Sequence, residues 1–204
     1  MVSCREYALF ACAVLRQANL AARIRVFFNK FYYEPFNHDQ ILLEFWNENV
    51  QEWHKADLRF KLSDLSLKLA ISLDFFNVQE EHYISAARAW IDCRAHPNLA
   101  MRFFGGNKKG LWYVRDRLIQ DLAALNKVEM LLWDCWGLMT CPEKEMTRKN
   151  FFLLDQLAEM MLNPDQNFFE LREMYFKHEE FRVPKKILSF SPAQGAVSVF
   201  IEEG

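Results

Sequence analysis

The 204-residue sequence has no surplus of charge of either sign. Lys and Arg together number 25 and Asp and Glu 27, so the formal net charge is -2. No run of like charges suggests a charged tail. Proteins that bind nucleic acid carry a basic patch that neutralises phosphates. We therefore expect no nucleic-acid partner.

Long apolar runs are also missing. A membrane-spanning helix needs roughly 20 consecutive apolar residues, and no stretch of the sequence approaches that length. The first residues lack the basic segment followed by an apolar segment that marks a secretory signal. We expect a protein without membrane association, located in the cytoplasm.

The cysteines make neither a disulfide framework nor a zinc motif. Their number is odd and their spacings contain no CxxC pair, which favours free thiols in a reducing compartment. We therefore predict no metal and no organic cofactor. The five cysteines are Cys4, Cys12, Cys93, Cys135 and Cys141.

What the sequence does contain is enough apolar mass for a core, with 51% hydrophobic residues and 15% aromatic ones. The first third of the chain changes its hydrophobic period from that of a helix to that of strands. This pattern predicts a helix followed by an antiparallel meander, and hence an α+β fold. The expected elements are a helix over 4–18 and strands over 22–28, 40–46 and 51–57.

The remainder is predicted to be mainly helical, with an irregular tail after Pro184. We expect one domain over 1–60, the catalytic core, and a helical extension over 61–204 packed on it. The predicted helices cover 79–94, 111–125, 147–162 and a last segment that opens at Asn163-Pro164 and ends near 176.

The most informative tetrapeptide is Ser3-Cys4-Arg5-Glu6. Serine followed three residues later by glutamate is a capping box, which places Cys4 in the first turn of the helix. A helix N-terminus offers free N–H groups and a partial positive charge, and both favour a thiolate. Cys4 is therefore a candidate nucleophile, whereas the plain alternative is a buried, inert cysteine.

Two further residues fit a thiol mechanism. His38 stands at the start of a predicted strand, where an imidazole could take the thiol proton and later return it. Asp57 ends the next strand, where a carboxylate could orient that imidazole. The alternatives are a surface histidine in a loop and an aspartate at a strand end.

The order of these three residues resembles the transglutaminase-like superfamily. Cys4 to Arg16 is similar to that family's cysteine helix, and Ala21 to Arg25 to the strand that follows it. His38 to Trp46 and Trp53 to Asp57 are similar to the segments that hold the family's histidine and aspartate. Gly110 to Gly137 resembles the helical extension of a bacterial subgroup.

The resemblance implies a papain/transglutaminase-like core, a helix plus a three-stranded antiparallel sheet, that lacks an N-terminal segment. It also implies a Cys4–His38–Asp57 triad that attacks an amide bond and forms a thioester, leading to acyl transfer, deamidation or hydrolysis. The substrate would be a protein, a peptide or a small amide, and a homodimer is possible. The alternative is a catalytically inactive binding protein with the same fold.

Polar residues also follow one another along the predicted helix 111–125, among them Arg115, Asp116 and Asp121. They could line a substrate groove. Because oppositely charged residues three or four positions apart are common on exposed helix faces, we expect them to form a solvated or salt-bridged face instead.

Overall fold

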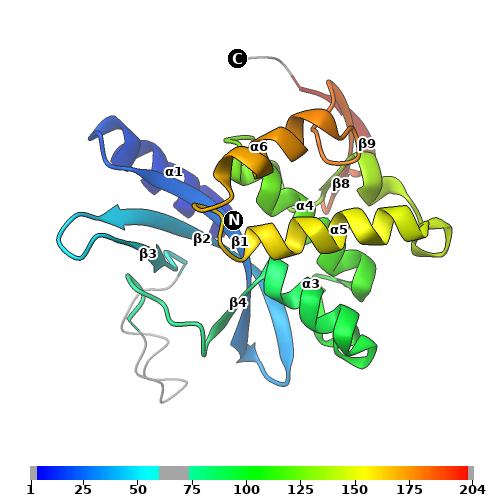
Figure 1. Cartoon of the computed structure of the whole chain (residues 1–204), viewed down its shortest axis with the longest axis horizontal. Helices are drawn as coiled ribbons and strands as arrows, with labels where there is room; N and C mark the ends of the chain where they lie inside the picture. The colour runs from blue at the N-terminus through cyan, green and yellow to red at the C-terminus, as the bar shows by residue number, and fades with distance from the viewer. Residues whose placement is uncertain (1–3, 60–73, 202–204) are drawn as a thin grey trace. The chain divides into compact units, whose positions relative to one another are not determined.

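A computed structural model describes residues 4–59 and 74–201 of the chain (Figure 1). The chain divides into two compact units, Met1–Ile84 and Ser85–Gly204, which are described separately. The predicted α+β class is confirmed. The predicted domain boundary between residues 60 and 61 and the predicted cap Ser3 lie outside the described residues.

The first unit consists of one helix and a sheet. The predicted helix and the three predicted antiparallel strands are present, and a further short strand pairs with β1. The order across the sheet in this unit is β4-β1-β2-β3. The elements are α1 (Cys4–Gln17), β1 (Ala22–Tyr33), β2 (Phe36–Asn47), β3 (Glu52–Ala56) and β4 (Tyr83–Ser85), whose last residue begins the second unit.

The two faces of this sheet differ, because successive side chains of a strand point to opposite faces. Helix α1 packs on β1 and β2 with its buried Ala8 and Cys12. Leu42 points to the face opposite the neighbouring Leu43 and belongs to an apolar cluster with Phe27 and Tyr83. Each face of β2 therefore contributes to a different apolar layer.

The second unit is built around one buried helix. Helices α3 and α5 pack on α4, in which 13 of 15 residues are buried. A separate three-stranded sheet has the order β7-β8-β9. The elements are α3 (Ala86–Ala95), η1 (Pro97–Arg102), β5 (Phe103–Gly105), β6 (Lys108–Lys109), α4 (Leu111–Leu125), β7 (Asp134–Cys135), η2 (Gly137–Thr140), η3 (Glu143–Glu145), α5 (Arg148–Met161), α6 (Phe168–Lys177), β8 (Lys186–Ser191) and β9 (Gly195–Phe200).

Three predictions for this part of the chain are wrong. The helix predicted over 79–94 begins only at Ala86, because Tyr83 to Ser85 form strand β4 and the Ser85 hydroxyl caps the helix by accepting a hydrogen bond from Arg88 N. The last helix begins at Phe168 and not at Pro164. The tail after Pro184 forms the antiparallel hairpin of β8 and β9.

One close backbone contact depends on glycine. Gly137 has φ +48°, in the left-handed region where side chains are disfavoured. A Cβ at this position would stand 2.4 Å from the carbonyl oxygen of Glu180, and Leu138 N donates a hydrogen bond to the same oxygen at 3.0 Å. Only glycine lets the two segments approach this closely.

Candidate functional site

Cys4 lies at the start of α1, beside the backbone of β2. Its sulfur accepts a hydrogen bond from Ile41 N, and the charged groups that act on it include Asp39, Asp57 and Arg59. Pairing between β2 and β3 ends at Leu43 and Ala56, so the β2 backbone at residues 39–41 extends past the end of β3.

Burial dominates the chemistry of this thiol. Removal from water raises the pKa of Cys4 above its ordinary value, because burial disfavours the charged thiolate. The hydrogen bond from Ile41 N and the charge of Arg59 lower the pKa, whereas the charges of Asp39 and Asp57 raise it. The net effect is upward, so Cys4 stays a neutral thiol at pH 7.

Asp57 is the second member of the site. It follows β3 and is almost fully buried, at 1% exposure. Its Oδ1 accepts hydrogen bonds from Gln40 Nε2 at 2.9 Å and from Arg59 N at 3.0 Å, and its Oδ2 accepts one from the Tyr83 hydroxyl at 2.7 Å. Burial raises the pKa of Asp57, against the lowering effect of these hydrogen bonds.

His38 has different neighbours. Its Nδ1 lies 2.8 Å from the carbonyl oxygen of Asp39 and 3.5 Å from Asp39 Oδ1, and its ring packs against Tyr33 at 5.3 Å between centroids. The hydrogen bonds of Asp57 go to Gln40, Arg59 and Tyr83. The charge of Asp57 thus acts on the Cys4 thiol, while His38 lies against Asp39 and Tyr33.

Gln40 is the site residue that the sequence analysis missed. It is fully buried, and its amide is the side chain of β2 that binds Asp57. A search of the sequence for titratable residues does not find Gln40, because a side-chain amide does not titrate. The strand pattern nevertheless points to Gln40. Pairing of Leu43 with Ala56 sets Leu42 opposite Asp57, and Gln40, two residues before Leu42, lies on the same face of β2.

This arrangement has limited chemical capacity. The nitrogen of a side-chain amide donates hydrogen bonds and takes up no proton at neutral pH. Gln40 can therefore orient itself on Asp57 but cannot act as a general base towards Cys4. Its Oε1 is buried and has no hydrogen-bond partner among the described residues.

A groove on the same unit is lined only by apolar surface. It has a volume of about 350 Å³ and lies between α1 and the sheet face on which α1 packs. Phe10 and Val14 from α1 line one side, and Leu43 and Phe45 from β2 line the other. Phe10 is 74% exposed and Val14 is 52% exposed, so the groove opens to solvent among the described residues.

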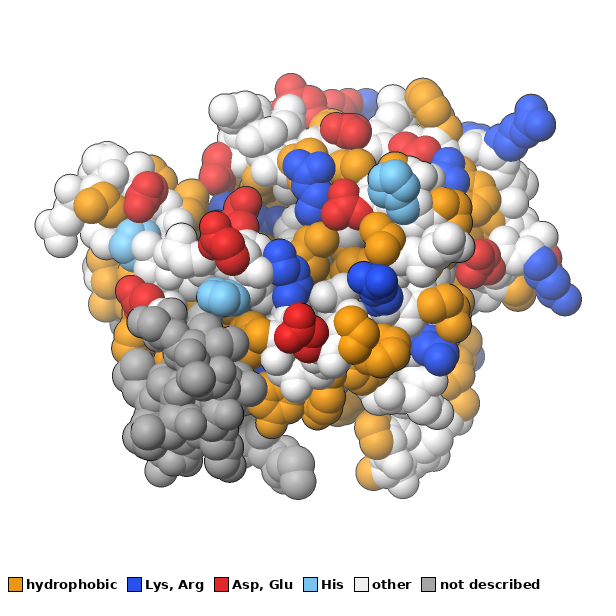
Figure 2. Space-filling view, turned by 90° about the horizontal axis from the view of Figure 1, so that it is seen from below, with side chains coloured by type: hydrophobic (Ala, Val, Ile, Leu, Met, Phe, Trp, Pro, Cys, Tyr) orange, Lys and Arg blue, Asp and Glu red, His pale blue; other side chains and the backbone are white. Residues whose placement is uncertain are grey.

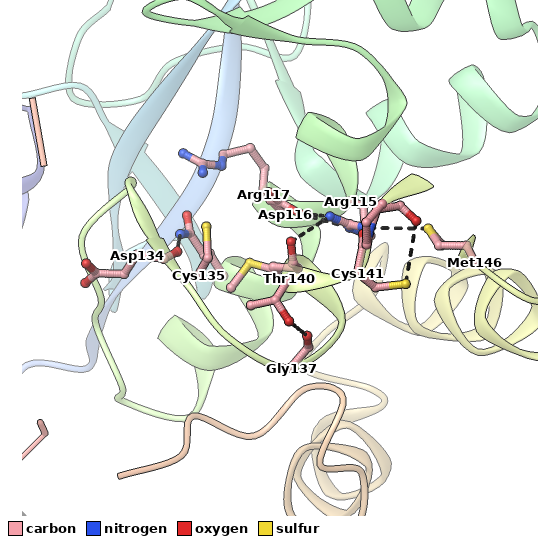
Figure 3. Close-up of polar contacts among 12 residues, drawn as sticks. Arg115, Asp116, Arg117, Asp134, Cys135, Gly137, Thr140, Cys141 and Met146 are labelled. Atoms are coloured by element: carbon pink, nitrogen blue, oxygen red, sulfur yellow. Dashed lines mark hydrogen bonds and ion pairs between the residues drawn. The ribbon is translucent and has the colours of Figure 1, made fainter. Parts of the chain in front are cut away.

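The polar residues of α4 form a second cluster, in the second unit (Figure 3). Arg115 donates to the carbonyl oxygens of Met139 at 2.9 Å and Cys141 at 2.7 Å, and it pairs with Asp116. Of the expected solvated or salt-bridged face, the salt bridge between Arg115 and Asp116 is present, but the face is not solvated, because Arg115, Asp116 and Asp121 are all buried. Arg115 holds the loop of η2 and η3 onto the helix.

Gln120 acts in the same way one turn further along α4. Its Nε2 donates to the carbonyl oxygens of Leu131 at 3.2 Å and Asp134 at 2.9 Å, while Asp134 Oδ2 accepts from Leu131 N. These bonds fasten the segment after α4 to the helix. The cluster is therefore a structural tether.

Neither a metal cluster nor a membrane span is found in the parts of the chain that the structure describes. No group of three His, Cys, Asp or Glu side chains could hold a metal ion among residues 4–59 and 74–201. Over the same residues no helix is long and apolar enough to cross a membrane. The face drawn in Figure 2 mixes blue and red side chains with hydrophobic ones.

Comparison with known proteins adds no relative. No family model, no curated protein and no solved structure matches this chain. The transglutaminase-like assignment, with its Cys4–His38–Asp57 triad, therefore stays a prediction based on the motifs of the sequence.

Proposed function

We propose that this chain is a catalytically inactive binding protein built on a transglutaminase-like core. The observation that carries the proposal is the 2.9 Å hydrogen bond from Gln40 Nε2 to Asp57. In a thiol mechanism the carboxylate orients a base that removes the thiol proton. Here the oriented group is an amide, which cannot take that proton.

The state of the thiol supports the same proposal. Reactive cysteines have a lowered pKa, because the thiolate is the nucleophile. Burial raises the pKa of Cys4 instead, so little thiolate forms at neutral pH. Thioester formation needs a thiolate, and burial disfavours the thiolate form of Cys4.

The kind of partner follows from the apolar groove beside α1. No polar surface lines it, so a ligand that depends on hydrogen bonds gains nothing there. A volume of about 350 Å³ accommodates one or two apolar side chains. We propose a protein or peptide partner that inserts such side chains between Phe10 and Phe45.

The rate at which iodoacetamide alkylates Cys4 tests this function. Alkylation should be followed by mass spectrometry of the Cys4 peptide across a range of pH, with the half-buried Cys141 of the same chain as an internal reference. Cys4 should react no faster than free cysteine at pH 7. Its rate should rise only above about pH 8.5, where an ordinary thiol ionises.

The opposite result would support the enzyme. Fast alkylation of Cys4 at pH 7 that is lost in His38→Ala would mean that His38 serves the thiol, and the proposal of an inactive protein would be abandoned. A Cys4→Ser variant verifies that the labelled peptide is the correct one.

A further inference from the structure

We propose that two copies of this chain pair edge to edge through β9, which joins their two three-stranded sheets into one. Strand β9 lies in the second unit and the apolar groove lies in the first, so this surface is additional to the proposed function. Three features of β9 support the pairing: the direction of its backbone groups, the residues that it lacks, and the sizes of its exposed side chains.

Strand β9 is an edge of its sheet, because the order of the sheet is β7-β8-β9 (Figure 1). In an antiparallel ladder, successive residues direct their N–H and C=O groups to opposite sides of the strand. Phe190 N donates to Trp133 O at 3.0 Å, so Phe190 bonds towards β7 and the preceding Ser189 bonds towards β9. The same alternation holds at the other end of the hairpin, where Ile201 N donates to Lys185 O at 2.8 Å.

The alternation identifies the residues of β9 whose backbone groups point outwards. Ser189 pairs with Val197, so Val197 bonds back towards β8. Its neighbours Ala196 and Ser198, and by the same alternation Phe200, direct their N–H and C=O groups away from β8. These groups take part in no backbone hydrogen bond among the described residues. They form an open edge along Ala196, Ser198 and Phe200, which are all exposed.

This edge has none of the usual protection against pairing. Proteins keep their edge strands from joining other chains by making them short or by placing charged side chains, proline or a bulge in them. Strand β9 (Gly195–Phe200) is six residues long and contains neither a charged residue nor a proline. It pairs with β8 in a continuous register. The strand is therefore suited to pairing with another strand.

The partner that fits this edge is the same edge of a second copy. The outward residues are spaced evenly about Ser198. An antiparallel copy aligned on Ser198 sets Ala196 opposite Phe200 of the second copy and Ser198 opposite its counterpart, as a two-fold axis requires. Every outward N–H then meets an outward C=O. A copy in another register leaves some of these groups without a partner.

The side-chain sizes agree with this register. Side chains of opposite residues share one face of a sheet, and Phe190 stands opposite Ala196 across the hairpin. The row across the joined sheets therefore reads Phe190, Ala196 and Phe200 of the second copy. Phe190 is 41% exposed and Phe200 is 71% exposed. The small alanine between the two rings leaves room for both, so pairing removes apolar surface from water.

The dimer is expected to be weak. A pair of short strands buries less surface than the roughly 1,200 Å² at which stable interfaces begin. The net charge of -2 gives two copies little mutual repulsion. We therefore expect a reversible equilibrium between monomer and dimer, with dimer formed at high micromolar concentration.

Charge at position 198 tests the pairing. In Ser198→Lys, and separately in Ser198→Glu, two like charges would face each other across the two copies. Like charges in contact oppose association, so the dissociation constant measured by sedimentation velocity should rise about tenfold or more in each variant. An equimolar mixture of the two variants should restore the dimer, because opposite charges then meet. Circular dichroism checks that each variant is folded.

Disulfide trapping tests the register. Cα atoms of a hydrogen-bonded antiparallel pair are about 5.5 Å apart, which a disulfide can span. Under oxidised glutathione, which takes up the two electrons and two protons of the thiols, Ser198→Cys should form a disulfide between copies. Val197→Cys is the matched control, because residue 197 faces the other side of the sheet and should not cross-link. Mass spectrometry of the linked peptide separates this disulfide from those of native cysteines.

Three results would overturn the inference. The first is a wild type that sediments as a monomer up to millimolar concentration. The second is a dimer that neither Ser198→Lys nor Ser198→Glu weakens. The third is a dimer that is lost in Phe10→Ser instead, since Phe10 lines the groove of the first unit and the copies would then meet there. None of these results depends on the reactivity of Cys4, so the proposed function is tested separately.

Discussion

The two units of this protein use buried polar groups in contrasting ways. In the second unit the guanidinium of Arg115 and the amide of Gln120 bind backbone carbonyls of the segments that follow α4. In the first unit Gln40 and Asp57 bind each other, and the amide oxygen of Gln40 has no partner among the described residues. The polar groups of the second unit hold segments of the chain together, whereas those of the first unit join side chains to one another.

The difference shows how a buried charge can be judged. A charge whose hydrogen bonds go to backbone groups of distant segments stabilises the fold, and its loss leaves those carbonyls unsatisfied. A carboxyl whose bonds come from an amide, a hydroxyl and a nearby backbone N–H contributes little that a neutral group could not replace. Three substitutions turn this contrast into measurements.

The largest effect is expected for Arg115→Met. The variant leaves Asp116 as a buried carboxylate without its ion pair and leaves the carbonyls of Met139 and Cys141 without their donors. Removing one member of a buried pair costs about 3–5 kcal/mol. Urea unfolding should show a loss of that size, and a loss below about 1 kcal/mol would mean that the α4 cluster is not a tether.

A smaller loss is expected for Gly137→Ala. The new Cβ would meet the carbonyl oxygen of Glu180 at 2.4 Å, and the backbone would be held in the left-handed region at φ +48°. The two costs together amount to roughly 3 kcal/mol. Gly195→Ala is the matched control, since it also has positive φ, at +73°, but meets no atom within 4 Å. Equal losses in the two variants would show that the contact with Glu180 is unimportant.

The smallest effect is expected for Asp57→Asn in the first unit. Asparagine keeps the shape, still accepts from Gln40 and Arg59, and lets the Tyr83 hydroxyl turn from donor to acceptor. Because burial raises the pKa of Asp57, the neutral replacement also removes a cost of ionisation. Urea unfolding at pH 7 should change by less than about 1 kcal/mol. A loss as large as that of Arg115→Met would make Asp57 structural and end the contrast.

Local sequence patterns predicted some elements well and others poorly. Helix α4 was predicted over its full range because its apolar residues recur at helical spacing. Its surroundings were not predicted. A helix rich in Arg and Asp normally lies at the surface, whereas here those residues are buried and Arg115 and Arg117 donate to carbonyl oxygens of their own unit. Tyr83 to Ser85 were assigned to a helix because their strand exists only through pairing with β1.

The candidate site, too, was predicted only in part. The order of Cys4 at a helix start and Asp57 after a strand led to the prediction that they form one site. In the structure the charge of Asp57 raises the pKa of the Cys4 thiol, and the triad stays a prediction. The choice of His38 as their partner rested on residue type. Strand register decides which side chain binds Asp57, and the register of β2 with β3 places Gln40 there.

By itself the sequence determined the elements with strong periodicity and the α+β class, because these depend on local spacing and chain order. The tertiary structure decided which side chain of β2 binds Asp57 and that the polar residues of α4 are buried. Strand register and burial arise from contacts between residues far apart in the chain.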